Sequence, residues 1–234
     1  MYAFTLSHPA AVLPFSHFKR LSLTSLVIGS MVPDFDYFIH MKMSSPYGHK
    51  ISGLIWFDPL LGLLLLVIYN RLVKNKLIDH LPVFLKKRFY ILKSPEKTWL
   101  GNNIIIILIC LVIGAATHLL WDSFTHPTGY FVNHLNVLNH SFRLGHYFLV
   151  GYNLLQHIST VIGGLIIFFA IKNMPVAGVA AGKNVARYWL LAAGVAGVIL
   201  FIRITTGTGL MIGDYVVTAI SGGFTGLIVV SVAF

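Results

Sequence analysis

The residues best suited to chemistry lie in the segment His118-Leu-Leu-Trp-Asp122-Ser-Phe-Thr-His126-Pro127. On a helix, His118 and Asp122 are four positions apart and project from one face, where both can bind the same metal ion. They lie at the end of an apolar stretch, and an ionisable residue in a membrane span indicates a functional site. His126 shares this face if the helix continues to Pro127. The alternative is a His–Asp hydrogen bond that joins two helices.

A second candidate is the segment Pro33-Asp34-Phe-Asp36, which directly follows a short apolar stretch. Two carboxylates this close repel each other unless a cation lies between them, and both can supply oxygen ligands to a divalent cation. The alternative is a structural turn in which Asp34 caps a helix. Asp36 is also a candidate for holding a ligand histidine by a hydrogen bond.

Three further histidines can complete a metal site. His8 precedes a proline, His49 follows a glycine, and His157 lies in an apolar segment near Asn153 and Gln156. Each alone fits a structural histidine, although a buried imidazole without a partner is costly. Together, imidazoles and carboxylates match the ligand set of zinc, with manganese and iron as alternatives. We therefore expect these segments to converge on one pocket, with Asn153 and Gln156 available as hydrogen-bond partners of the ligands.

The composition indicates a membrane protein. Of 234 residues, 56% are hydrophobic and only 10% are charged, against about a quarter charged in soluble domains. A single cysteine excludes an internal disulfide framework. The N-terminal segment lacks the pattern of a signal peptide, so we expect it to be retained.

The hydropathy pattern predicts an all-α, polytopic membrane helix bundle with about five transmembrane helices plus short N-terminal half-buried helices. Four spans are clear: Leu100–Trp121, Tyr152–Ile171, Tyr188–Ile204 and Met211–Phe234. In a fifth, Ile51–Asn70, we expect Asp58 to cap a helix that begins at Pro59. The stretch Leu21–Val32 is too short to span and is expected to end at Pro33. Residues 1–234 then form one membrane-embedded domain, in which 1–160 carry the site and 161–234 add transmembrane helices.

The distribution of cations predicts the orientation. Eight Lys and Arg residues lie between Asn70 and Thr98, against only Arg143 between Asp122 and Gly151. The positive-inside rule places the first loop in the cytoplasm and the second outside, although the first fifty residues carry four more cations. A basic loop between two spans does not indicate a nucleic-acid partner.

The histidines are unevenly distributed with respect to this orientation, because nine of eleven fall on the side opposite the basic loop. These nine are His8, His17, His40, His49, His118, His126, His134, His140 and His146. The predicted site therefore faces outward from a bacterial inner membrane. His17, His40, His126, His134, His140 and His146 receive no role from the sequence, and the oligomeric state stays open.

Several of these motifs resemble an uncharacterised bacterial integral-membrane family. They are Thr5-Leu-Ser-His8-Pro-Ala-Ala-Val-Leu-Pro14, Ile28-Gly-Ser-Met-Val-Pro-Asp34, Gly48-His49, the segment from His118 to His126, and Leu155-Gln-His157. That family distantly resembles inner-membrane metal-dependent hydrolases and the zinc-dependent phospholipase C group. The resemblance implies as metal ligands His8, Asp34, His49, His118 and Asp122, with Asp36 and His157 in the same polar cluster.

The function expected from these features is metal-dependent hydrolysis of an ester, foremost a phosphoester in a membrane lipid. A bound metal would activate water, and whichever of Asp34 and Asp36 is not a ligand would act as base. One alternative is a transporter or channel that moves protons or cations through the His/Asp cluster. A non-catalytic metal-binding protein is another. No phosphate-binding loop, nucleophile elbow or HExxH motif is present.

Overall fold

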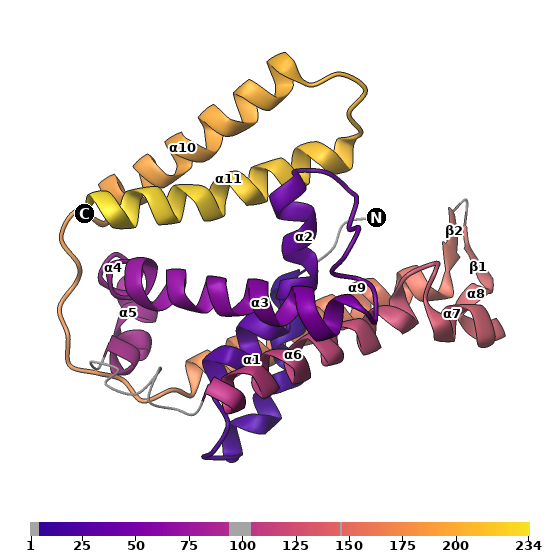
Figure 1. Ribbon diagram of the computed structural model, residues 1–234, viewed down its shortest axis with the longest axis horizontal. Helices are drawn as coiled ribbons and strands as arrows, with labels where there is room; N and C mark the ends of the chain where they lie inside the picture. The colour runs from indigo at the N-terminus through magenta and orange to yellow at the C-terminus, as the bar shows by residue number, and fades with distance from the viewer. Residues whose placement is uncertain (1–4, 94–103, 146) are drawn as a thin grey trace.

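The computed structural model describes residues 5–93, 104–145 and 147–234, and it is built almost entirely from helices (Figure 1). Within these residues, five helical stretches are long and apolar enough to cross a membrane. This confirms the predicted all-α polytopic bundle. Residues 100–103, the start of one predicted span, lie outside the described part.

The first two of these stretches are built from several elements each. Gly53–Asp79 comprises α3 (Gly53–Ile68), the π-helical η2 (Tyr69–Val73) and α4 (Lys74–Asp79). Ile104–His134 comprises α6 (Ile104–Thr125) and α7 (Tyr130–His134). In α6, eighteen residues separate Ile104 from Asp122, which is about 27 Å along the helix axis.

The other three are single helices: α9 (Gly151–Lys172), α10 (Val185–Thr206) and α11 (Ile212–Ala233). Large apolar side chains on α9 and α10 stay exposed, among them Phe168, Leu190 and Phe201. Such surfaces suit contact with lipid rather than with water.

Three short elements precede α3, as expected. They are the 3-10 helix η1 (Thr5–His17), α1 (Leu23–Gly29) and α2 (Val32–His40). The predicted end of the first apolar stretch at Pro33 was wrong, because α1 already ends at Gly29. Pro33 instead lies in the first turn of α2, where a missing N–H costs no helical hydrogen bond. Asp34 and Asp36 therefore lie on a helix and not in a turn.

The predicted start of α3 at Pro59 was also wrong. The helix begins at Gly53, so Asp58 is not its cap but a buried residue inside it. The extra turn is held by aromatic packing, since the Tyr47 ring lies 5.6 Å from Trp56 and 5.4 Å from Phe57. These contacts offset the one helical hydrogen bond that Pro59 cannot donate.

Close contact between α1 and α6 forms the centre of the fold. A Cβ atom at Gly114 would overlap the backbone of Leu26 and Ser30, and one at Gly29 would overlap the backbone of Leu111. Only glycine permits this approach. The contact places the end of α1 one helical turn from His118.

The hairpin of α10 and α11 packs along α2 and the loop that follows it. The Asp214 carboxylate accepts a hydrogen bond from the backbone N–H of Met43 at 2.7 Å, and Arg203 donates to the carbonyl of Met41 at 3.2 Å. Ser221 donates to the carbonyl of Phe38. The C-terminal helices thus fix the start of the loop that carries His49.

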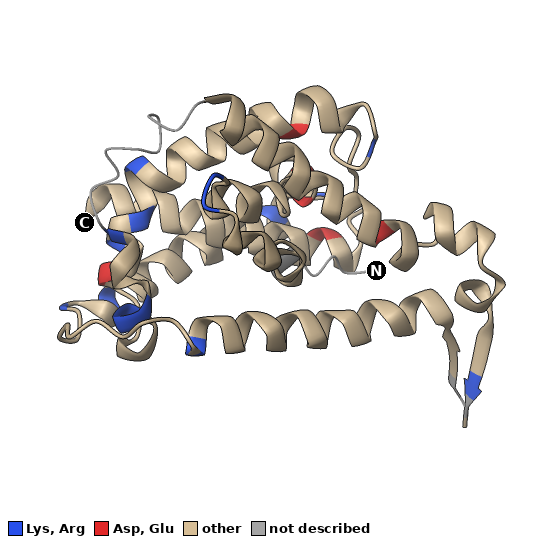
Figure 2. Ribbon diagram, turned by 90° about the horizontal axis from the view of Figure 1, so that it is seen from below, with Lys and Arg blue, Asp and Glu red and all other residues tan. Residues whose placement is uncertain are grey.

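The remaining elements lie at the two ends of the molecule. At one end are α5 (Val83–Phe89) and the 3-10 helix η3 (Tyr90–Lys93). At the other, α8 (Asn136–Asn139) leads into the antiparallel strands β1 (Ser141–Leu144) and β2 (Tyr147–Val150), which project from the body (Figure 1). Figure 2 shows Lys and Arg gathered at the end formed by α4 and α5.

Candidate metal centre

Five of the six predicted ligands meet at the C-terminal end of α6. His118 and Asp122 come from α6, His8 from η1, Asp34 from α2, and His49 from the loop between α2 and α3. His118 is completely buried, and Asp34 is 1% exposed. Four chain segments thus contribute to one polar cluster in the protein interior.

Four donor atoms lie at separations that suit a single metal ion. His49 Nε2 is 3.4 Å from Asp34 Oδ1 and 3.2 Å from Asp122 Oδ2. His118 Nε2 is 3.6 Å from Asp34 Oδ1 and 3.2 Å from Asp122 Oδ2. Ligands of a tetrahedral zinc ion, with bonds of about 2.0–2.1 Å, lie about 3.4 Å apart. These four N···O separations match the spacing expected between ligands of one zinc ion.

The His118 ring is oriented by a backbone carbonyl. Its Nδ1 lies 2.8 Å from the carbonyl oxygen of Ser30, at the end of α1. Because a carbonyl can only accept, Nδ1 carries the proton, and in the neutral ring Nε2 presents a lone pair to the carboxylates. Nε2 is buried and has no hydrogen-bond partner in the described part of the chain. This arrangement is typical of metal-binding histidines.

The His49 ring is oriented by a hydroxyl that Asp36 holds in turn. Ser45 donates from its Oγ to Asp36 Oδ2 at 2.8 Å, so the same Oγ accepts from His49 Nδ1 at 2.9 Å. Asp36 Oδ2 also accepts the backbone N–H groups of Tyr47 and Gly48. Asp36 thus fixes the loop, and His49 Nε2 is left facing Asp34 and Asp122.

The second oxygen of Asp122 faces two other histidines. Oδ1 lies 3.7 Å from His8 Nε2 and 3.4 Å from His126 Nδ1. The His8 ring stacks on the His118 ring at 3.8 Å between centroids. Two groups of donors can therefore hold a metal: Asp34 with His49 and His118, and His8 with His118 and Asp122.

Burial and neighbouring charges set the protonation of the residues outside α6. Burial, together with the nearby His118, lowers the pKa of His8 to about 4, so its imidazole is neutral at pH 7. Burial raises the pKa of Asp34, but the His118 and His49 imidazoles outweigh it and hold that pKa well below its usual range. Burial lowers the pKa of His49, whereas hydrogen bonds to Asp122 and Asp34 raise it, with a net rise. The ionised carboxylates thus stabilise a positive charge next to them, either a protonated imidazole or a metal cation.

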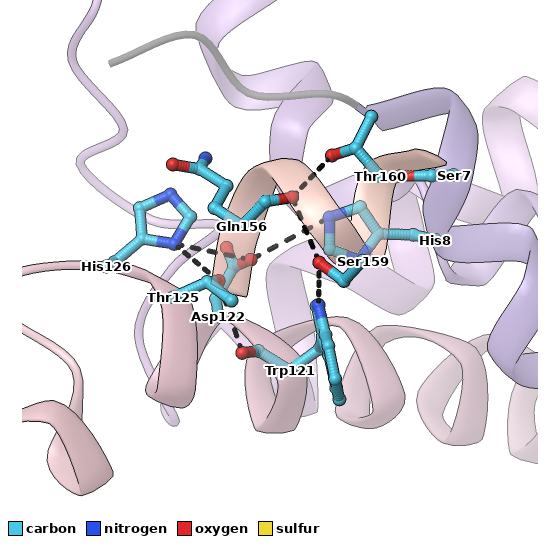
Figure 3. Close-up of a pocket in the computed structure, with 9 residues that line it drawn as sticks. All are labelled: Ser7, His8, Trp121, Asp122, Thr125, His126, Gln156, Ser159 and Thr160. Carbon is cyan, nitrogen blue, oxygen red and sulfur yellow. Dashed lines mark hydrogen bonds and ion pairs between the residues drawn. The ribbon is translucent and has the colours of Figure 1, made fainter. Parts of the chain in front are cut away.

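A small cavity of about 20 Å³ lies against the Asp122 side of the cluster (Figure 3). Its lining comes from η1, the end of α6 and α9: Ser7, His8, Trp121, Asp122, Thr125, His126, Gln156, Ser159 and Thr160. A space of this size holds about one water molecule. The cluster therefore has room for water on the side of His8 and His126.

His157 does not join the cluster. Its side chain is exposed on α9, and it belongs to neither group of donors. Gln156, Ser159 and Thr160 line the cavity, and a step of one residue turns the helix by about 100°. His157 therefore points away from the face that these three share. Asn153, predicted as a partner, does not line the cavity, whereas Gln156 does.

The other histidines that were predicted to lie on the same side have separate positions. His40 Nδ1 lies 2.8 Å from the carbonyl of Asp36, and His134 stacks on Tyr130. His17 is exposed, and the His140 ring packs against Phe142. His146 lies outside the described residues. The concentration of histidines on one side thus reflects several local contacts as well as one site.

Three residues that contact the cluster received no role from the sequence: His126, Ser30 and Ser45. His126 was visible four positions after Asp122, and it joins because its N–H still bonds the carbonyl of Asp122 at 3.0 Å. Ser30 acts through its backbone carbonyl, and Ser45 through a hydroxyl in an irregular loop. Neither serine has a sequence signal, because both act through contacts set by the fold.

The Ser45 hydroxyl offers a test of the cluster that spares every donor atom. Ser45→Ala should weaken metal binding about 10- to 100-fold, the usual cost of losing a group that orients a ligand. Competitive titration with a zinc indicator measures this affinity. Ser52→Ala, a serine of the same loop without a side-chain cap hydrogen bond, is the matched control. Equal affinities for the two variants would show that Ser45 does not orient His49.

Comparison with known proteins gives one family. The family model described as a domain of unknown function, DUF4184, matches residues 3–232. No curated protein and no solved structure matches the chain. Because the match covers nearly the whole chain, this helical membrane-type protein with a buried His/Asp cluster belongs to the DUF4184 family.

Proposed function

We propose that the cluster binds a divalent metal, zinc in the first place, through His49, His118, Asp34 and Asp122. The observation that carries this proposal is that both imidazole Nε2 atoms lie 3.2–3.6 Å from an oxygen of each carboxylate, although the four residues come from three separate segments. Both histidines have their other ring nitrogen held by an acceptor, so each lone pair is directed inward. Two imidazoles and two carboxylates form a ligand set that suits zinc, with manganese or iron as alternatives.

The proposed activity is hydrolysis of an ester, foremost a phosphoester in a lipid. A bound divalent metal lowers the pKa of water and polarises a phosphoryl oxygen. The chain itself supplies the water cavity, with His8 and His126 beside the second oxygen of Asp122. His126 lines the cavity and is placed to exchange a proton with that water. Asp36, whose Oδ2 already accepts three hydrogen bonds, holds the loop in this mechanism, and Asp34 serves as ligand.

A lipid substrate is supported by the surroundings of the cavity. It lies between α6 and α9, two helices that can cross a membrane. Trp121, at the rim, is 39% exposed and donates from its indole N–H to Ser159 Oγ at 3.3 Å. Tryptophan with one polar and one apolar contact is characteristic of the membrane boundary. A polar headgroup could therefore approach the cluster while its acyl chains stay in lipid.

Hydrolysis by the metal-loaded protein tests this activity. Purified protein in vesicles should release phosphate or headgroup from phospholipid, and His126→Ala should lower the rate about 100-fold or more at unchanged metal content. His134→Ala, an exposed histidine stacked on Tyr130, is the control and should keep the rate. A water-soluble phosphodiester as second substrate separates lipid specificity from phosphoester chemistry. If the metal-loaded protein cleaves neither phosphoesters nor carboxylic esters, the hydrolase proposal is wrong, and a non-catalytic metal-binding role remains.

One buried carboxyl favours a second candidate function, the translocation of protons or cations. Asp58 lies inside α3, is 1% exposed, and neither of its carboxylate oxygens has a hydrogen-bond partner among the described residues. A carboxyl in such a place needs a proton or a cation. Proton or cation flux into vesicles, lost in Asp58→Asn but kept in His126→Ala, would support this candidate over hydrolysis.

The proposed location is a bacterial inner membrane, with the cluster on the non-cytoplasmic side. Support comes from the separation of charge along the molecule, since the cations gather at the α4–α5 end (Figure 2), whereas His118 and Asp122 lie near the C-terminal end of α6. The positive-inside rule then assigns the α4–α5 end to the cytoplasm.

A further inference from the structure

The end of the molecule opposite the metal cluster carries a strong excess of positive charge. The cations here are Lys74, Lys76, Lys86, Lys87, Arg88, Lys93, Lys172, Lys183 and Arg187. Among the described residues of this end the only acid is Asp79, and Lys93 already binds it at 2.6 Å. We call the surface formed by α4, α5, η3, the last residue of α9 and the start of α10 with the residues before it the basic end. Its excess of positive charge favours binding of an anionic partner.

The basic end lies where several candidate spans end. The stretch beginning with α3 ends at Asp79, α9 ends at Lys172, and α10 begins at Val185. Hydrogen bonds to backbone carbonyls join these ends. The backbone N–H of Ala177 donates to the carbonyl of Lys87 at 2.9 Å, and the Trp189 indole N–H donates to the carbonyl of His80 at 2.7 Å. In a membrane this surface would lie at the level of the headgroups.

Apolar side chains are exposed next to the cations. Phe84 is 45% exposed and Ile91 is 55% exposed, with Val83, Tyr90 and Leu92 beside them. Cations alone would suit any polyanion, whereas cations interleaved with exposed apolar side chains suit the boundary between headgroups and acyl chains. This combination favours a lipid over a nucleic acid or a soluble protein.

Arg88 is preorganised for a phosphate. Its guanidinium stacks over the Phe84 ring at 3.9 Å and donates to the carbonyls of Phe84 at 2.9 Å and Lys172 at 3.2 Å. These bonds use two of the five N–H donors and hold the planar group in place. The remaining N–H groups can donate to phosphate oxygens, for which the guanidinium fork is well suited. The bond to Lys172 also brings the end of α9 next to α5.

We propose that Arg88, together with Lys87 and Lys172, binds the phosphate of an anionic phospholipid whose acyl chains contact Phe84 and Ile91. The site is independent of the metal cluster, since it lies at the other end of α6 and shares no residue with it. It would fix α5 and the end of α9 against the membrane surface, where each cation near anionic lipid contributes favourably.

Lipid binding to the purified full-length protein tests the proposal. In detergent, phosphatidylglycerol should raise the melting temperature more than phosphatidylcholine with the same acyl chains, and added salt should reduce the difference. Arg88→Gln should weaken phosphatidylglycerol binding about tenfold or more, because a charge-assisted hydrogen bond is lost. Native mass spectrometry measures the bound lipid. Arg143→Gln, an exposed arginine on β1 that donates to the carbonyl of Gly145, is the matched control.

Two further measurements keep the result interpretable if Arg88→Gln disturbs α5. Lys87→Gln with Lys172→Gln removes two charges without removing the Arg88 contacts, and should weaken phosphatidylglycerol binding about fivefold or more. Inorganic phosphate at equal concentration should not reproduce the stabilisation. The proposal is overturned if the two lipids stabilise the wild-type protein equally, if Arg88→Gln and Arg143→Gln bind phosphatidylglycerol equally, or if inorganic phosphate has the full effect.

Discussion

Alanine at His118 or at Asp122 is expected to abolish metal binding, and each change alone should suffice. His118 takes part in both groups of donors, and Asp122 contacts His49 and His118 through one oxygen and His8 through the other. Losing His118 disrupts both groups of donors, and losing Asp122 removes one of the four donors that we propose for the ion. We expect one zinc or manganese ion per wild-type chain and an affinity lower by more than about 100-fold in each variant. Elemental analysis of protein purified in detergent measures the metal content.

His157→Ala is the matched control for these two variants. The sequence predicted His157 as a ligand, but the structure leaves it exposed on α9, so this variant should keep its full metal content. Circular dichroism and gel filtration check that all three variants fold. Wild-type protein without a transition metal after expression in metal-replete medium would contradict the proposed centre, and metal loss in His157→Ala would contradict the ligand set.

Single cysteines on opposite ends of the molecule should show an all-or-none difference in labelling of intact cells. Phe84 lies on α5 at the basic end and Asn136 begins α8 at the far end, and both are exposed. In a Cys110→Ser background, which removes the single buried cysteine, a membrane-impermeant maleimide should label Asn136→Cys and leave Phe84→Cys unlabelled. The physical reason is the positive-inside rule, which holds the basic loop in the cytoplasm.

Permeabilised cells provide the control for this experiment, because both cysteines should then react. Preferential labelling of Phe84→Cys in intact cells would reverse the orientation. The metal cluster would then face the cytoplasm, and the basic end would meet the outer leaflet.

Local sequence patterns were sufficient to predict most of the secondary structure. Runs of apolar residues predicted α6, α9, α10 and α11 within a few residues of their ends, because a helix that meets lipid must satisfy its backbone internally and be apolar over its full length. The pairing of His118 with Asp122 was equally local, since helical geometry alone places residues four apart on one face. The helix ends at Gly29 and Gly53 were missed, because packing of α1 on α6 and of Tyr47 on Trp56 and Phe57 decided them.

The membership of the cluster was decided by tertiary structure. Glycines let α1 approach α6, and α11 holds the loop after α2, so that Asp34 and His49 come from separate segments to the end of α6. His157 lies on a different face of α9 and stays exposed. Asp36, which with Asp34 was a candidate base, contacts His49 through Ser45, a contact that the sequence does not reveal. Residue types and spacing along one helix can predict which side chains share a face, but contacts between segments depend on backbone approach and loop geometry, which composition and periodicity do not encode.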